Sequence, residues 1–116
     1  MQVTIYHNPR CSKSRQTLAL LEERGVEPRV VEYLKTPPAA EELREILGML
    51  GVGPADLLRT GESEYRELGL DEADVTDARR IEAMITHPKL MQRPIVVCGG
   101  KARIGRPPEQ VLEILP

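Results

Sequence analysis

Cys11 is the residue of this chain best placed to do chemistry, because basic and hydroxyl side chains flank it. Its neighbours are Arg10, Ser12, Lys13, Ser14 and Arg15. A β-forming segment precedes them and a helical pattern follows, which puts Cys11 at the start of a helix. Backbone N–H groups and the helix dipole at such a position favour a thiolate. They lower a cysteine pKa from about 8.5 to roughly 3.5–7.5.

The same donors can hold an anion beside the sulfur. The pattern therefore predicts a nucleophilic cysteine that attacks an oxyanion. The alternative interpretation is a small buried cysteine, but the basic flank favours the nucleophile. His7, four residues earlier, either polarises the thiol or bonds to the backbone, and both interpretations stay open. Cys98 ends an apolar segment and is predicted to be a core residue. If it lay near Cys11, it could instead resolve an intermediate.

Three arginines could supply charge to such a site. Arg93 and Arg106 each precede a proline, which holds their backbone extended. Arg59 lies in the middle of the chain, shortly before Gly61. Three guanidinium groups converging on one anion would offer forked donors and permanent charge. Spacing alone does not bring them together.

Composition limits the classes of function. The chain has 116 residues, 41% hydrophobic and 29% charged, with no Trp or Phe, so we expect one domain with an aliphatic core. A net charge of -2 argues against binding nucleic acid or an anionic membrane. No apolar run is long enough to cross a bilayer, and the start of the chain lacks a signal peptide's pattern. We therefore expect a cytoplasmic protein.

The two cysteines should be thiols there, since a secreted disulfide scaffold would use more. No Cys and His spacing suits zinc, so no metal is expected. Nothing in the sequence requires more than a monomer.

The elements that must position these residues follow from hydrophobic periodicity. Strands are predicted at 2–6, 29–34, 94–98 and 101–105. A helix from Ser12 ends near Gly25, and a second buries the stripe Leu43, Ile46, Leu47 and Leu50. Further helices are expected at 55–58, after a cap at Thr76 or Asp77, and after 107–108 with Val111, Leu112 and Leu115 inward.

This order indicates an α/β, thioredoxin-like fold: a mixed four-stranded sheet flanked by helices, with a helical insertion at about 38–88 of a single domain, 1–116. In that layout the residue before the third strand lies beside the cysteine helix, often through a cis-proline. Pro94 is the candidate.

Several separated motifs resemble the glutaredoxin-dependent arsenate reductases, essentially from end to end. They are IYHNPRCSKSR (5–15), YLKTPP (33–38), LLR (57–59), YRELGL (65–70), HP (87–88), RPIVV (93–97) and RP (106–107). The resemblance implies that Cys11 is the nucleophile and that Arg59, Arg93 and Arg106 bind the oxyanion. It implies supporting roles for His7, which influences the cysteine, and for Ser14, which can hydrogen-bond the thiolate. Arg15 and Pro94 complete the expected site.

The resemblance also implies a reaction. Cys11 attacks arsenate, glutathione attacks the adduct as co-substrate, and glutaredoxin clears the resulting mixed disulfide, with no bound cofactor. Two features depart from the family pattern. The chain ends at Pro116, where some members carry a longer tail, and Cys98 is not a family catalytic position.

Other functions are also compatible with a reactive cysteine at a helix start. A glutathione-dependent thiol oxidoreductase would need Cys11 but not all three arginines. A redox-responsive regulator typically carries C-x-x-C, whereas Ser14 occupies the second position here. A low-molecular-weight phosphatase needs C-x5-R, and Thr17 stands where that arginine would be. The sequence leaves open the physiological substrate, the rates and the thiol partner.

Overall fold

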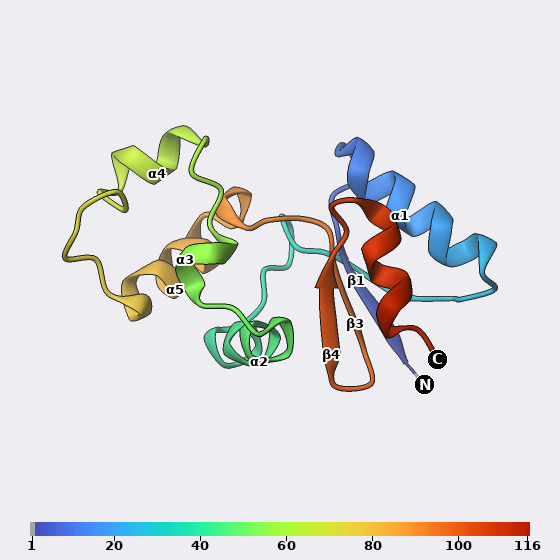
Figure 1. Cartoon of the computed structure of the whole chain (residues 1–116). Coiled ribbons are helices and arrows are strands. Elements are labelled where there is room, and N and C mark those ends of the chain that lie inside the picture. Colours follow the sequence, from blue (N-terminus) through green and yellow to red (C-terminus); the bar gives the residue numbers. More distant parts are fainter. Residues whose placement is uncertain (1) are drawn as a thin grey trace. The chain divides into compact units, whose positions relative to one another are not determined.

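The computed structural model describes residues 2–116. The chain forms two compact units, one made of residues up to 36 and from 93 onward, and the other of residues 37–92 (Figure 1). The helical insertion expected at about 38–88 falls within the second unit. That the whole chain acts as a single domain stays a prediction.

The first unit is built on a four-stranded sheet. Its strands are β1 (Val3–His7), β2 (Arg29–Glu32), β3 (Ile95–Cys98) and β4 (Lys101–Ile104). Their order is β2-β1-β3-β4, with β1 parallel to β2 and antiparallel to β3, and with β3 antiparallel to β4. The mixed four-stranded sheet predicted from the sequence is confirmed. Strand β2 is shorter than expected because the carbonyl of Glu32 accepts the N–H groups of Lys35 and Thr36 in a turn.

Helix α1 (Ser12–Glu23) follows β1 directly. Gly25, two residues beyond its last residue, has a φ of +75°. Gly25 donates its N–H to Glu22 and Val26 donates to Leu21, the paired bonds by which a left-handed glycine closes a helix. Leu21 of α1 packs with Ile5 and Val96 of the sheet, so one helix face and the sheet share a core.

The last element is the final helix expected from the sequence, and it is a 3₁₀ helix, η2 (Pro108–Ile114). Val111 and Ile114 are its buried apolar side chains, whereas Leu112 is only half-buried. Of the residues expected to face inward, Val111 is fully buried, whereas Leu112 and Leu115 are half-buried. A 3₁₀ helix has three residues per turn, so positions i and i+3 lie on one line. Val111 and Ile114 satisfy that spacing and join the core shared by α1 and the sheet.

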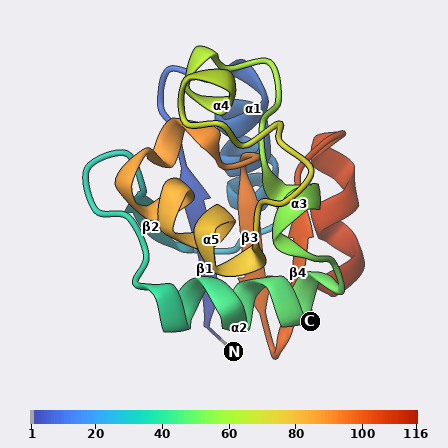
Figure 2. The same ribbon diagram turned by 90° about the vertical axis from the view of Figure 1, so that its left-hand side faces the viewer.

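The second unit consists of short helices. They are α2 (Ala40–Leu50), α3 (Pro54–Leu57), α4 (Ser63–Glu67), α5 (Asp77–Thr86) and the 3₁₀ helix η1 (Pro88–Leu90). Leu43, Ile46 and Leu47 of α2 are buried as predicted, and α5 contacts α2, α3 and η1 (Figure 2). The Oγ1 of Thr76 accepts the Arg79 N–H at 3.1 Å and so caps α5. Between the two candidate caps, the structure selects Thr76.

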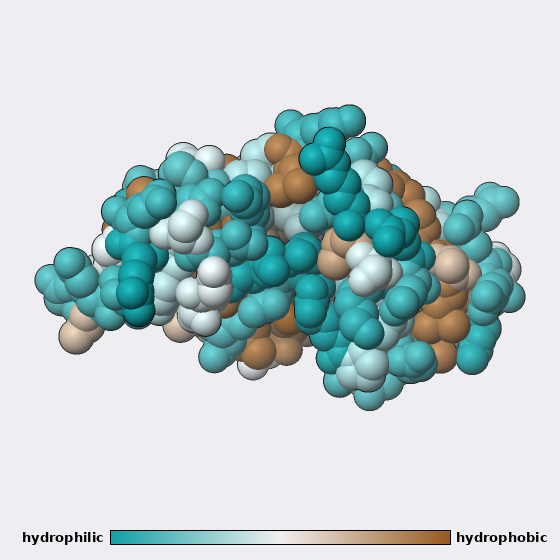
Figure 3. All heavy atoms as spheres, turned by 90° about the horizontal axis from the view of Figure 1, so that it is seen from above, coloured by the Kyte–Doolittle hydropathy of each residue, from teal (hydrophilic) through white to brown (hydrophobic). Residues whose placement is uncertain are grey.

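The surface is largely polar. On the face drawn in Figure 3, hydrophilic residues dominate and hydrophobic ones form small separate patches. The large apolar side chains that are exposed are Val30, Leu34 and Val52. Within residues 2–116, no helix has the length and apolar character that a membrane crossing requires.

Candidate functional site

Cys11 occupies the N-cap of α1, between the end of β1 and the first helical turn. A tight loop brings the chain there. The carbonyl of Asn8 accepts the Cys11 N–H at 3.0 Å, and the Asn8 Oδ1 accepts the Arg10 N–H at 3.0 Å. Arg15 ties the same loop down by donating from Nη1 to the Pro9 carbonyl at 2.9 Å. The Cys11 side chain therefore has the place predicted from the sequence, although the residue is only 8% exposed.

The surroundings of the sulfur favour the thiolate. Burial raises the pKa of Cys11, but several donors outweigh it and bring the pKa below its ordinary value. They are, in order, the backbone N–H of Ser14, the charge and hydrogen bond of the Arg93 guanidinium, and the backbone N–H of Lys13. These N–H groups belong to the first turn of α1, where no carbonyl of the helix can accept them. Helix start and arginine together account for the lowered pKa.

Ser14 acts on Cys11 through its backbone, while its hydroxyl has other partners. The Ser14 Oγ lies 2.6 Å from the His7 Nδ1 and accepts the Asn8 N–H at 3.0 Å. Burial, and to a smaller extent the charge of Arg15, lower the pKa of His7, while Glu32 opposes the shift. A neutral His7 can accept the Ser14 hydroxyl proton at Nδ1. Ser14 thus hydrogen-bonds the Cys11 sulfur with its backbone N–H, while its hydroxyl links His7 to Asn8.

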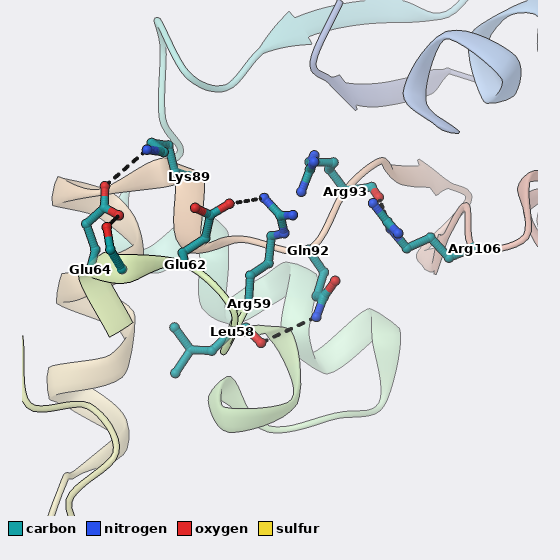
Figure 4. A network of polar contacts seen from close by, with 9 residues as sticks. Leu58, Arg59, Glu62, Glu64, Lys89, Gln92, Arg93 and Arg106 are labelled. Carbon is teal, nitrogen blue, oxygen red and sulfur yellow. Dashed lines mark hydrogen bonds and ion pairs between the residues drawn. The ribbon is translucent and has the colours of Figure 1, made fainter. Parts of the chain in front are cut away.

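Arg93 lies on the segment that precedes β3, and Arg106 lies on the segment that follows β4. The two residues are in contact. The Nε of Arg106 donates to the carbonyl of Arg93 at 2.8 Å (Figure 4). The Arg93–Pro94 peptide is cis, as predicted for Pro94, and so is Arg106–Pro107, which was not predicted. The Nε and Nη1 of Arg93 are buried without a hydrogen-bond partner among residues 2–116. Unsatisfied buried donors of a charged group are costly, and an oxyanion would satisfy them.

Arg59 belongs to the second unit, two residues after the end of α3. Its backbone N–H donates to the Leu90 carbonyl at 2.7 Å. Its Nη1 donates to the Glu62 Oε1 at 2.6 Å, in an ion pair whose side chains are 27% and 24% exposed (Figure 4). The first unit thus collects His7, Cys11, Ser14, Arg93 and Arg106 around the start of α1, and Arg59 is fixed within the second unit by its own contacts.

Comparison with known proteins places this arrangement in a family. A family model for the ArsC family matches residues 6–114. The chain belongs to the ArsC family. It is 60% identical over 98% of its length to an uncharacterised protein of Escherichia coli K12, of which it covers 97%. It is 48% identical over 99% of its length to an arsenate reductase of Haemophilus influenzae, which it covers completely.

A solved structure of an arsenate reductase from Vibrio cholerae superposes with a TM-score of 0.96. The two chains are 54% identical, with 99% of this chain and 98% of the other covered. The thioredoxin-like fold predicted from the sequence is that of the ArsC family members of known structure.

The Glu62 partner of Arg59 was not foreseen. Glu62 follows Arg59 by three positions and its N–H donates to the Arg59 carbonyl at 3.3 Å, so the two opposite charges face one another across a turn. The spacing of the two charges in the sequence could have suggested this pair.

Cys98 lies outside the site. It pairs with Val3, at the end of β1 opposite to His7. Four residues of a strand span about 13 Å, so Cys98 is at the far end of the sheet from Cys11, and it is 1% exposed. The core interpretation fits this position, and a resolving role does not. Among residues 2–116, His, Cys, Asp and Glu side chains form no cluster suited to a metal ion.

Proposed function

We propose that this protein is an arsenate reductase that uses Cys11 as its nucleophile, glutathione as co-substrate and glutaredoxin to regenerate the thiol. One observation carries the proposal. The Cys11 sulfur sits at a helix start where two backbone N–H groups and the Arg93 guanidinium converge. The arsenate reductases among its close relatives support arsenate as the oxyanion.

The first step forms the bond between sulfur and arsenic. The Cys11 thiolate attacks arsenic(V), and one oxygen of arsenate leaves as water after taking up a proton. Arsenic remains pentavalent. The N–H groups at the start of α1 and the unsatisfied donors of Arg93 hold the remaining oxygens, whose charge shifts during the attack.

The second step transfers the electrons. The glutathione thiolate attacks the Cys11 sulfur, an S–S bond forms, and the S–As bond breaks with its electron pair on arsenic. Arsenic gains two electrons and leaves as arsenite, while each sulfur is oxidised by one electron. A glutaredoxin thiolate then attacks the glutathione sulfur of the mixed disulfide and releases the Cys11 thiolate.

The three arginines have different roles in this mechanism. Arg93 both stabilises the thiolate and binds an arsenate oxygen, and Arg106, which donates its Nε to the Arg93 carbonyl, contributes a second positive charge beside it. Arg59 is the third member of the set. No bound cofactor is needed, since electrons come from glutathione. We place the protein as a monomer in the cytoplasm, where glutathione keeps thiols reduced.

A coupled assay tests the proposal. Purified protein is mixed with arsenate, glutathione, glutaredoxin and glutathione reductase, and NADPH oxidation is followed. We expect turnover that requires arsenate and glutaredoxin, is abolished in Cys11→Ser and persists in Cys98→Ala. Turnover of a small disulfide without any response to arsenate would favour the thiol oxidoreductase. A reactive Cys11 with neither activity would favour the regulator.

A further inference from the structure

Gly105 joins the two cis-proline segments of the first unit. It follows β4 and precedes Arg106. Its N–H donates to the Pro94 carbonyl at 2.9 Å, and the Arg106 N–H donates to the Ile104 carbonyl at 2.9 Å. The second bond closes a three-residue turn centred on Gly105. Gly105 therefore ties the segment of Arg106 to the segment of Arg93 and Pro94.

The space around Gly105 is filled by helix α1 as well as by Pro94. A Cβ placed on Gly105 would lie 2.5 Å from the Thr17 Oγ1, 2.8 Å from the Pro94 Cγ and 3.2 Å from the Thr17 Cγ2. Carbon and oxygen atoms that are not bonded do not approach so closely, so a side chain of any size would push these segments apart.

The neighbours cannot yield easily. Thr17 is 0% exposed, and its Oγ1 donates to the Lys13 carbonyl at 2.8 Å, which fixes its rotamer. Lys13 in turn gives its N–H to the Cys11 sulfur. The closed ring of Pro94 lets its Cγ move only by the small change between ring puckers. A Cβ at position 105 must therefore move backbone and not merely the end of a flexible side chain.

Position 105 requires glycine because there is no room for a Cβ, and not because of its backbone conformation. Gly105 is not one of the glycines with a positive φ, whereas Gly25 and Gly51 are. A Cβ on Gly48 or Gly61 would meet nothing within 4 Å. Gly105 therefore has much tighter surroundings than Gly48 or Gly61, and it lies next to Arg106.

We propose that Gly105 is a positioning residue of the site. By lacking a side chain, it lets α1 close against the segment of Pro94 and Arg106. That closure keeps the Arg93 guanidinium on the Cys11 sulfur and the Arg106 side chain on the Arg93 carbonyl. The effect on arsenate turnover rests on the proposed function, but the effect on the thiol does not.

The test is Gly105→Ala, read out first on the thiol. The pKa of Cys11 is measured from thiolate absorbance and from the pH dependence of alkylation, in the folded variant. We expect the pKa to rise, because Arg93 moves away from the sulfur. We also expect the arsenate KM to rise about tenfold or more, since a displacement near 1 Å can cost about 10²-fold. Gly48→Ala is the matched control and should behave as wild type.

A second substitution distinguishes a specific effect on the position of Arg93 from a general loss of stability. Thr17→Ala removes two of the three atoms that the new Cβ would meet. In Gly105→Ala/Thr17→Ala we expect the Cys11 pKa and the arsenate KM to return part of the way to wild type, a coupling that unrelated losses of stability would not show. If Gly105→Ala fails to fold, recovery of folding and of the low pKa in the double variant supports the same conclusion.

Two results would overturn the inference. One is a folded Gly105→Ala protein with the Cys11 pKa and arsenate KM of wild type. The other is a double variant no better than Gly105→Ala. If the thiol pKa shifts as expected but wild-type protein does not reduce arsenate, Gly105 keeps its role and the proposed function fails.

Discussion

The Nδ1 of His7 and the Oγ of Ser14 lie 2.6 Å apart, and the same oxygen accepts the Asn8 N–H at 3.0 Å. This contact joins the last residue of β1 to the first turn of α1. It commits the Ser14 hydroxyl to the strand–helix junction, while the Ser14 N–H faces the Cys11 sulfur. The side chain of Ser14 thus stabilises the strand–helix junction, and its backbone N–H stabilises the Cys11 thiolate.

Ser14→Ala should separate these two contributions. It leaves a buried His7 nitrogen and the Asn8 N–H without their partner, so we expect the free energy of unfolding to fall by about 1–3 kcal/mol. The Cys11 pKa should stay low, because the Ser14 N–H remains. Denaturant unfolding and thiolate absorbance measure the two quantities, with Ser12→Ala, at an exposed position, as control. A Cys11 pKa raised to that of an ordinary thiol would show that the hydroxyl also acts on the sulfur.

His7 should make stability depend on pH. Burial first, and then the charge of Arg15, lower the pKa of His7 in the folded state, with Glu32 opposing. In the unfolded chain the pKa is about 6.5. Between the two values the unfolded state binds more protons, so stability rises with pH there. The contribution is complete above about pH 6.5 and is lost as pH falls toward the folded pKa.

Unfolding free energies between about pH 5 and 7.5 test this in wild type and His7→Gln. We expect the downward slope below about pH 6.5 to be smaller in His7→Gln. His87→Gln is the control. An identical slope in wild type and His7→Gln would mean that other groups cause it.

Arg93 should affect the thiol before any substrate is present. Arg93→Ala removes a charge and a hydrogen bond from the Cys11 sulfur, so the Cys11 pKa should rise. Arg93→Lys keeps the charge and should raise it less. In arsenate turnover we expect Arg93→Ala to lower kcat/KM by about 10²–10³-fold, the usual loss for one donor of an oxyanion site. If the Cys11 pKa were the same in both variants and in wild type, Arg93 would have no influence on the thiolate.

In the proposed reaction, Glu62 would compete with arsenate for the Arg59 guanidinium. The 2.6 Å ion pair between them must loosen if Arg59 is to bind arsenate. Glu62→Gln removes the competing charge, and we expect the arsenate KM to fall about two- to fivefold, matching about 0.5–1 kcal/mol for a partly exposed pair. Glu82→Gln breaks the similarly spaced pair with Arg79 and is the control. A KM that is unchanged in Glu62→Gln, or lowered equally in Glu82→Gln, would argue against this competition.

Local patterns in the sequence predicted the frame of the site. β-Formers before Cys11 and an amphipathic pattern after it predicted the strand–helix junction, and the structure places the cysteine at the N-cap. Pro94 was predicted to be the cis-proline beside that helix, and it is cis. These features depend on residues that are close in sequence and on the order of strands and helices. Hydrophobic periodicity and turn residues indicate both directly.

The sequence by itself thus determined the four strands, the cysteine at a helix start and the candidate arginines. Only the tertiary structure decided which groups meet. Arg93 reaches the Cys11 sulfur, the Ser14 hydroxyl turns to His7, and Thr17 and Pro94 close around Gly105. It also decided that the last helix is 3₁₀. These outcomes depend on side-chain direction and on close packing between segments far apart in the chain, which no local periodicity records.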